Sequence, residues 1–108
     1  QAGDREFFLE VLEPQGNVLG ESYSKTNDSG ASVTYSKGTN FYYENKNLDV
    51  CDYISKPAGD FQKGNYMVNV YDDGLKLLGT SKFTLKFSMC LMLRCFVFYG
   101  VVFILLFL

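Results

Sequence analysis

The sequence predicts an all-β fold, a sandwich or a small barrel, for residues 1–86, followed by a tail of different composition. Alternating apolar and polar runs recur along 1–86 with a turn signal roughly every 8–12 residues, as in such folds. No window in this part has a sustained apolar period of about 3.6 residues, so no long helix is expected there. In 87–108, by contrast, 19 of 22 residues are apolar, and all 12 acidic and 9 of the 10 basic residues precede this tail.

The first half of the chain should form short strands joined by polar turns. In order, we expect a strand at 7–12, a turn at 13–17, a strand at 18–23, a solvated loop at 24–32, a strand at 32–35, a turn at 37–40 and a strand at 41–44. Phe7, Leu9 and Val11 occupy alternate positions and so share one face of the first strand. Pro14 and Gly16 favour the first turn, because proline presets φ and glycine accepts a positive φ.

The second half contains the clearest hairpin. In order, we expect a turn at 45–47, a strand at 48–54, a loop at 55–60, a strand at 66–71, a turn at 72–74 and a strand at 82–86. Two runs of period two that flank an Asp-Gly turn are typical of an antiparallel hairpin. In the 48–54 strand, Asp52 shares a face with Val50 and Ile54, which predicts that the strand leaves the core or bulges there.

The tail, residues 87–108, is predicted to be helix-like. As a helix, its 22 residues would span roughly 33 Å, which matches the hydrocarbon core of a bilayer. Three interpretations stay open: a transmembrane anchor, a translation artefact beyond a natural domain that ends near Lys86, and a buried apolar element of the fold. The expected organisation is therefore a β domain at 1–86 and a hydrophobic tail at 87–108.

Composition excludes several classes of function. Histidine is absent, which removes Ser-His-Asp and Cys-His catalysis and the commonest metal ligand. A sequence pI near 5.0 without a basic cluster argues against nucleic acid. No Cys-x-x-Cys pair exists for zinc or redox chemistry, and a calcium ion needs more converging oxygens than the adjacent Asp72 and Asp73 offer. We therefore expect no enzyme activity and no catalytic, cofactor-binding or metal-binding residues.

Exposed tyrosines are the candidate interaction surface. Tyr42 and Tyr43 are consecutive, so one of them must face away from the core unless both sheet faces are covered. Tyr71 is opposite in phase to Tyr66 and should lie outside. Such rings can bind a protein or a glycan, because tyrosine combines a rigid apolar ring with a polar hydroxyl. The alternative is that these tyrosines pair across strands and only stabilise the sheet.

Two segments near the end of the β domain carry a family resemblance. Residues 61–71, FQKGNYMVNVY, resemble the penultimate strand of immunoglobulin-like β-sandwiches, and 72–85 resemble the final hairpin of bacterial modules of this kind. The opening 7–20 is similar to the first hairpin of such modules in cell-envelope proteins. The absence of tryptophan and of a cysteine pair to bridge two sheets favours the bacterial type over antibody-type domains.

The resemblance implies an immunoglobulin-like antiparallel β-sandwich of about six or seven strands. It also implies a tyrosine corner, in which the ring of Tyr66 enters the core, its hydroxyl bonds an upstream backbone group, and Gly64 allows a close approach. Such a fold requires one shared interior for the side chains of Tyr66, Val68, Phe83 and Leu85.

From these features we expect a non-catalytic binding or structural module of the cell envelope, on its periplasmic or extracellular face. The partner would be a protein or a glycan, bound through exposed tyrosines and a sheet edge. A membrane could be contacted through 87–108. The alternative is an accessory β-domain cut from a larger enzyme or secretion component, with the active part outside this chain.

Overall fold

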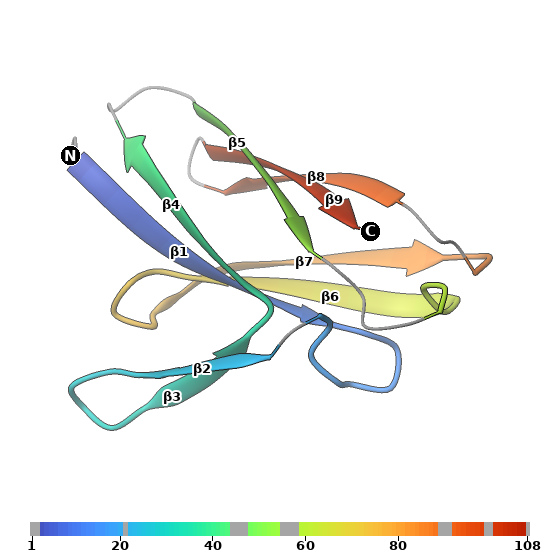
Figure 1. The fold of residues 1–108 in the computed structure, drawn as a ribbon, viewed down its shortest axis with the longest axis horizontal. Helices are drawn as coiled ribbons and strands as arrows, with labels where there is room; N and C mark the ends of the chain where they lie inside the picture. The colour runs from blue at the N-terminus through green and yellow to red at the C-terminus, as the bar shows by residue number, and fades with distance from the viewer. Residues whose placement is uncertain are drawn as a thin grey trace.

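The computed structural model describes residues 3–20, 22–43, 48–54, 59–88, 92–98 and 101–107, and the regular structure in these residues is entirely β-strand. The strands are β1 (Gly3–Leu12), β2 (Tyr23–Thr26), β3 (Ser32–Tyr35), β4 (Lys37–Tyr43), β5 (Leu48–Ile54), β6 (Gly64–Tyr71), β7 (Leu77–Leu85), β8 (Met92–Phe98) and β9 (Val101–Phe107). They form two sheets and a separate two-stranded hairpin (Figure 1). The predicted all-β class is confirmed.

The first sheet has the strand order β4-β1-β6-β7, and each neighbouring pair is antiparallel. The long strand β1 pairs with β4 from Gly3 to Leu9 and with β6 from Phe8 to Leu12. This sheet therefore contains the closing β6–β7 hairpin that the alternation and the Asp-Gly turn predict.

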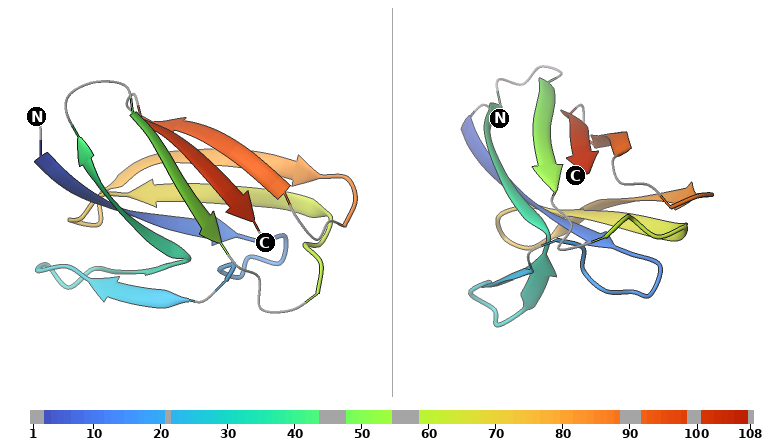
Figure 2. Two further views of the ribbon diagram at one scale, coloured as in Figure 1. Left: turned by 45° about the horizontal axis from the view of Figure 1, so that its top comes forward. Right: turned by 45° about the vertical axis from the view of Figure 1, so that its right-hand side comes forward.

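The second sheet has the order β5-β9-β8 and lies over one face of the first sheet, which we call the inner face (Figure 2). The central strand β9 is antiparallel to β8 and parallel to β5. The antiparallel sandwich predicted for residues 1–86 did not include this parallel β5–β9 pair, because β9 belongs to the tail. Parallel strands cannot be joined by a tight turn, and β5 and β9 are far apart in the sequence, so local signals could not reveal this pairing.

The helix-like tail predicted for 87–108 is wrong, because its described residues form β8 and β9. A continuous apolar run has no period that distinguishes a buried strand from a helix. The run is rich in phenylalanine and β-branched residues, which favour strands, and a strand beside a parallel neighbour is often apolar along its length. Arg94 of β8 places its guanidinium carbon 4.9 Å from the ring centre of Phe83 in the first sheet. The described residues include no helix with the length and hydrophobicity needed to cross a bilayer.

One hydrophobic core lies between the two sheets. Tyr66, Val68 and Leu85 are at most 2% exposed, and Phe83 packs against the same cluster, so the expected shared interior is present. Five of the 16 buried apolar side chains in the described residues come from the tail strands, which makes the tail part of this core: Phe96, Val101, Phe103, Leu105 and Phe107.

The return strand predicted for 18–23 is wrong. Val18 forms only one bridge, with Leu12, and the amide of Leu19 donates to the carbonyl of Val11 at 2.7 Å. Gly20 then adopts a φ of 79°, which only glycine accepts without strain, and the chain leaves the sheet.

The solvated loop predicted for 24–32 is partly wrong, because β2 occupies its first residues and pairs with β3. The turn between them is held by Asn27, whose side-chain oxygen accepts hydrogen bonds from the amides of Ser29 and Ala31. This β2–β3 hairpin packs on the outer face of the first sheet. There the ring of Tyr35 and the ammonium of Lys25 lie 4.7 and 4.8 Å from the ring centre of Phe8, which is 2% exposed.

The turn predicted for 37–40 is also wrong, since these residues belong to β4. Gly38 suggested a turn, but it pairs in register with Phe8 inside the sheet. The chain instead changes direction at the buried Ser36, between β3 and β4. Its amide donates to the carbonyl of Leu9 at 2.7 Å, and its hydroxyl accepts from the amide of Val11 at 3.1 Å.

β5 carries one acidic residue, Asp52, on the side that faces the core. Its side chain is mostly buried and accepts a hydrogen bond from the Thr39 hydroxyl of β4 at 2.8 Å, while Lys37 approaches at 3.3 Å. The register of β5 with β9 is regular, so the alternative of a bulge at this position is wrong. The predicted segments 45–47 and 55–58 lie outside the described residues.

Candidate functional site

The outer face of the first sheet carries the predicted interaction residues Tyr42 and Tyr71, because strand residues alternate between the two faces. A polar network crosses β1, β6 and β7 in the middle of this face. The side-chain amide of Asn69 donates to the Glu10 carboxylate at 2.8 Å, and the Thr80 hydroxyl donates to the Asn69 oxygen at 2.7 Å. These side chains therefore bond to one another across three strands of the sheet.

A hollow of about 460 Å³ lies at the end of the outer face where β1 begins. It is lined by residues of β1, of β4 and of the turn between β6 and β7: Asp4, Arg5, Glu6, Asn40, Phe41, Tyr42 and Asp73. In the β1–β4 register Asp4 is the partner of Tyr42, and Glu6 is the partner of Asn40, so the outward side chains form two adjacent rows. Tyr42 is 55% exposed, which makes the surface of its ring available to a ligand.

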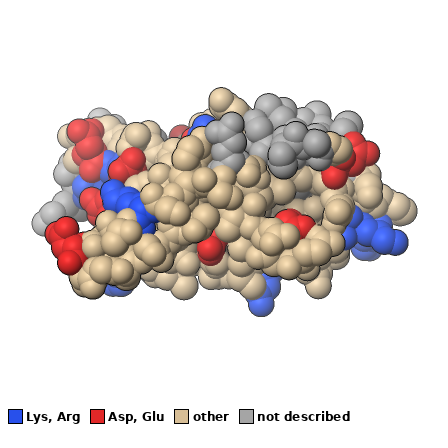
Figure 3. Space-filling view, turned by 60° about the horizontal axis from the view of Figure 1, so that its bottom comes forward, with Lys and Arg blue, Asp and Glu red and all other residues tan. Residues whose placement is uncertain are grey.

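Carboxylates dominate the charge of this hollow, which we call the Tyr42 hollow. Asp4, Glu6 and Asp73 line it, together with the guanidinium-bearing Arg5. Lys25 approaches Glu6 at 4.0 Å, but both side chains are more than a third exposed, so this ion pair contributes little stability. Figure 3 shows acidic and basic side chains gathered at both ends of this side of the molecule, with only isolated charged side chains between them.

Tyr71 belongs to the polar network rather than to the Tyr42 hollow. Its side chain is partly buried, and its hydroxyl donates to the Glu10 carboxylate at 3.4 Å. Burial, together with the negative charge of Glu10, raises the pKa of Tyr71 above its ordinary value of 10.0. The side chain of Tyr43 lies outside the part of the chain that the structure describes. Of the predicted interaction residues whose side chains are described, Tyr42 lines the hollow and Tyr71 does not.

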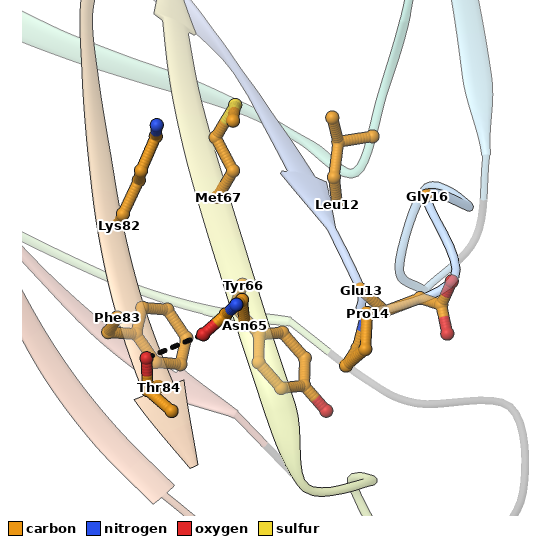
Figure 4. A pocket seen from close by; sticks show the side chains of 10 residues that line it. All are labelled: Leu12, Glu13, Pro14, Gly16, Asn65, Tyr66, Met67, Lys82, Phe83 and Thr84. Carbon is orange, nitrogen blue, oxygen red and sulfur yellow. Dashed lines mark hydrogen bonds between the residues drawn. The ribbon is translucent and has the colours of Figure 1, made fainter.

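A second, open groove of about 480 Å³ lies at the opposite end of β6, beside the turn at 13–17 (Figure 4). Leu12, Met67 and Lys82 are register partners on three neighbouring strands and form its floor. Thr84 donates a hydrogen bond to the side-chain oxygen of Asn65 at 2.7 Å, so this polar pair is satisfied internally. Its aromatic lining residues serve the core, so this groove lacks the exposed ring that the Tyr42 hollow has.

Tyr66 and Gly64, at the edge of this second groove, have structural roles. The Tyr66 hydroxyl donates to the backbone carbonyl of Gln62 at 2.6 Å, which is the upstream hydrogen bond that a tyrosine corner needs. A Cβ atom on Gly64 would lie 2.7 Å from the Pro14 ring, and its φ of 136° also favours glycine. Burial and the nearby negative charge of Glu13 raise the pKa of Tyr66. The hydrogen bond to Gln62 lowers the pKa, but the net shift is upward.

The polar lining of the Tyr42 hollow was not predicted from the sequence. Asp4, Glu6 and Asn40 carry no motif, and they meet only because β1 and β4 pair in one register. The sequence predicts a turn at 37–40, and a turn there is incompatible with the pairing of β4 with β1. Asp73 was predicted as a turn residue, and the β6–β7 turn that contains it reaches the hollow. Only the β1–β4 register brings these side chains together, and no local sequence pattern predicts that register.

The described residues also contain no cluster of three cysteine and acidic side chains that could hold a metal ion. The Asp72 carboxylate instead caps its own turn by accepting hydrogen bonds from the amides of Gly74 and Lys76 at 3.0 and 2.8 Å. The Tyr42 hollow offers a ligand one aromatic ring, one side-chain amide and three carboxylates, with Arg5 beside them.

The family described as a domain of unknown function, DUF8428, matches residues 1–86. Neither the curated proteins nor the solved structures give a significant match to this chain.

Proposed function

This chain belongs to the DUF8428 family of domains of unknown function, and we propose that it is a non-catalytic, glycan-binding module of the cell envelope. The proposal includes an immunoglobulin-like sandwich as its fold. The two facing sheets and the Tyr66–Gln62 hydrogen bond support that assignment. The cell-envelope location rests on the resemblance of the opening and closing hairpins to bacterial modules.

The exposed ring of Tyr42 is the observation that carries the proposed function. A sugar ring has an apolar face that can stack on an aromatic side chain, and its hydroxyl groups donate and accept hydrogen bonds. The side chains of Asp4, Glu6 and Asn40 surround Tyr42 and supply hydrogen-bond acceptors and an amide donor. Asp4 is the register partner of Tyr42, and Glu6 is the partner of Asn40, two residues along the strands. The hollow is shallow and open, which suits one or two sugar units of a longer chain.

A cationic protein segment is the second candidate ligand, favoured by the three carboxylates of the hollow. A lysine or arginine side chain could lie over the ring of Tyr42 while pairing with Asp4 or Glu6. Salt distinguishes the two ligands, because screening weakens the attraction between exposed charges and leaves the stacking of a neutral sugar almost unchanged.

The test compares Tyr42→Ala with Tyr53→Ala. Tyr53 is a matched control, because it is 51% exposed but lies on the second sheet. Binding of neutral oligosaccharides built from glucose, xylose and N-acetylglucosamine is measured by calorimetry at low and at high salt. We expect at least one oligosaccharide to bind, with a loss of affinity of about tenfold in Tyr42→Ala and no loss in Tyr53→Ala or at high salt.

Two results would contradict the glycan proposal. One is that none of the neutral oligosaccharides binds, while a lysine-rich peptide binds in a salt-dependent way that requires Tyr42. The other is that Tyr42→Ala and Tyr53→Ala weaken binding equally, because the Tyr42 hollow would then not be the site.

A further inference from the structure

β8 is an edge strand of the second sheet. The sheet has the order β5-β9-β8, so among the described strands β8 is hydrogen-bonded to β9 alone (Figure 2). Its register with β9 is regular from Met92 to Phe98, and the strand contains neither proline nor lysine. An edge of this kind presents unpaired backbone N–H and C=O groups, to which an extended chain can bind as one more strand.

One charged side chain of β8 faces the core side of the sheet. The guanidinium carbon of Arg94 lies 4.9 Å from the ring centre of Phe83 in the first sheet. The Nε atom of Arg94 is buried and has no hydrogen-bond partner. None of the ion pairs between described residues includes this side chain. Arg94 is thus a partly buried cation that rests on one aromatic ring and has no anionic partner among the described residues.

The opposite edge of the same sheet shows how a charged side chain in this position can be satisfied. On β5, Asp52 also faces the core side, accepts a hydrogen bond from the Thr39 hydroxyl at 2.8 Å and lies 3.3 Å from the ammonium of Lys37. Buried polar groups in folded proteins rarely lack such partners, and an unpaired buried charge is costly. The contrast between the two edges points to a ligand that supplies the anionic partner of Arg94.

We propose that β8 binds an extended acidic peptide segment of a partner protein as an added antiparallel strand, with a carboxylate opposite Arg94. The Cβ atoms of directly opposed residues in such a pair lie about 4.5–5.5 Å apart. A glutamate at that position therefore lies beside the guanidinium and can accept two parallel hydrogen bonds from it. The neighbouring peptide side chains point to the outer side, where Leu93 and Val97 are 57% and 67% exposed and favour aliphatic contacts.

Arg94 also disfavours a second copy of this chain as the occupant of the edge. An inward-pointing charge on an edge strand penalises any strand that buries it without a counter-charge. If two β8 strands paired about a two-fold axis at Cys95, Arg94 would lie opposite Phe96 of the other copy, and neither guanidinium would gain an anion. An acidic peptide is the occupant whose charge complements this edge. The inference is independent of the Tyr42 hollow, which lies on the first sheet.

The probe is the synthetic peptide Thr-Val-Thr-Val-Glu-Val-Thr with an N-terminal fluorescein, and its matched control has Gln in place of Glu. When this peptide pairs antiparallel with all seven residues of β8, its Glu lies opposite Arg94 and its three Val side chains point outward. Binding to the full chain and to the Arg94→Gln variant is measured by fluorescence anisotropy. We expect the unchanged chain to bind the Glu peptide about tenfold more tightly than the Gln peptide, and this preference should vanish in Arg94→Gln.

Two exposed thiols test where the peptide binds. Cys95 lies in the middle of β8, and Cys51 on β5 is its matched control, because both are register partners of Ile104 on opposite sides of β9. The central Val of the Glu peptide is replaced by Cys, which places it opposite Cys95 at a Cα separation of about 4.5–5.5 Å, within disulfide range. In a glutathione redox buffer, and with Cys90→Ser in every protein sample, capture is expected in Cys51→Ser and should be lost in Cys95→Ser.

Four results would overturn the proposal. The first is equal affinity of the unchanged chain for the Glu and Gln peptides, or no binding of either. The second is a preference for Glu that persists in Arg94→Gln, because another cation would then be responsible. The third is equal capture of the peptide by Cys51 and Cys95. The fourth is a covalent dimer of the chain through Cys95 that forms in place of peptide capture, since a second copy would then occupy the edge.

Discussion

Replacing Phe103 by alanine tests whether β9 is part of the core. The side chain is 0% exposed and packs against the rings of Phe7 and Phe41, at 5.7 and 6.4 Å between ring centres. A buried phenylalanine covers about 150–250 Å² of apolar surface, which corresponds to roughly 4–6 kcal/mol at about 25 cal/mol per Å². Because alanine keeps part of that area, the expected loss in the free energy of unfolding is about 3–5 kcal/mol.

The assay is urea unfolding, followed by circular dichroism and by tyrosine fluorescence, since the chain has no tryptophan. The matched control is Val97→Ala on β8. Val97 points outward and is 67% exposed, so its truncation should change the free energy of unfolding by no more than about 0.5 kcal/mol. Domains of this size have a total stability of about 5–15 kcal/mol, so the difference between the two variants is easily measured.

The comparison can refute the structural argument directly. If residues 92–107 were a membrane anchor or an unstructured appendage, truncation of Phe103 would not destabilise the β domain. Equal unfolding midpoints for Phe103→Ala, Val97→Ala and the unchanged chain would show that β9 does not fill the space between the sheets.

Three further substitutions or conditions probe local features. Leu75 has a φ of 66°, which strains a branched side chain, so Leu75→Gly should raise the free energy of unfolding by about 0.5 kcal/mol in urea titrations; a loss above 1 kcal/mol would contradict this. The pKa of Tyr66 is raised in the fold, so its contribution to stability is complete below its ordinary value of 10.0 and is lost as pH rises through the folded value. Tyr66→Phe should therefore show a shallower alkaline decline in urea midpoint, and an equally steep decline would contradict the assignment. Asp52→Ala leaves the Thr39 hydroxyl and Lys37 without their buried acceptor and should cost about 1–3 kcal/mol, whereas a neutral result would show that Asp52 is solvated.

The closing hairpin was predictable because its signals are local. Val68 and Val70 alternate with Met67, Asn69 and Tyr71, and both valines are fully buried at 0% exposure. The turn that follows is set by Asp72, whose carboxylate bonds two backbone amides of the same turn. Alternation and turn chemistry act within a few residues, so they can be read without knowing the rest of the fold.

The first half was less predictable because its polar residues have tertiary partners. Ser36 ends β3 by bonding to β1, and Gly38, which suggested a turn, sits in an extended strand against Phe8. Glycine and serine are compatible with both a turn and a strand, so the long-range pairing of β4 with β1 decides between them. The same pairing brings Asp4 beside Tyr42, which is why the exposed tyrosine was predictable and the polar lining around it was not.

The tail contains more apolar residues than its two strands need in order to fill the core. A strand with one buried face needs apolar side chains at every second position, yet β8 also presents Leu93 and Val97 outward, at 57% and 67% exposure. On the same outer face of the second sheet, Leu106 is the register partner of Leu93, and Ile104 is the partner of Cys95. Together with the buried residues, these outward residues give the tail the continuous hydrophobicity of a membrane span.

The outward excess can be removed without touching the core. The double variant Leu93→Lys and Val97→Lys should keep the urea midpoint of the unchanged chain, because both side chains are more than half exposed. It should bind less of the dye ANS, which reports exposed apolar surface, since the apolar patch on the second sheet would be interrupted by two charges. A fall in the midpoint as large as that of Phe103→Ala would mean that the two positions are buried, and the assignment of inner and outer faces on β8 would be wrong.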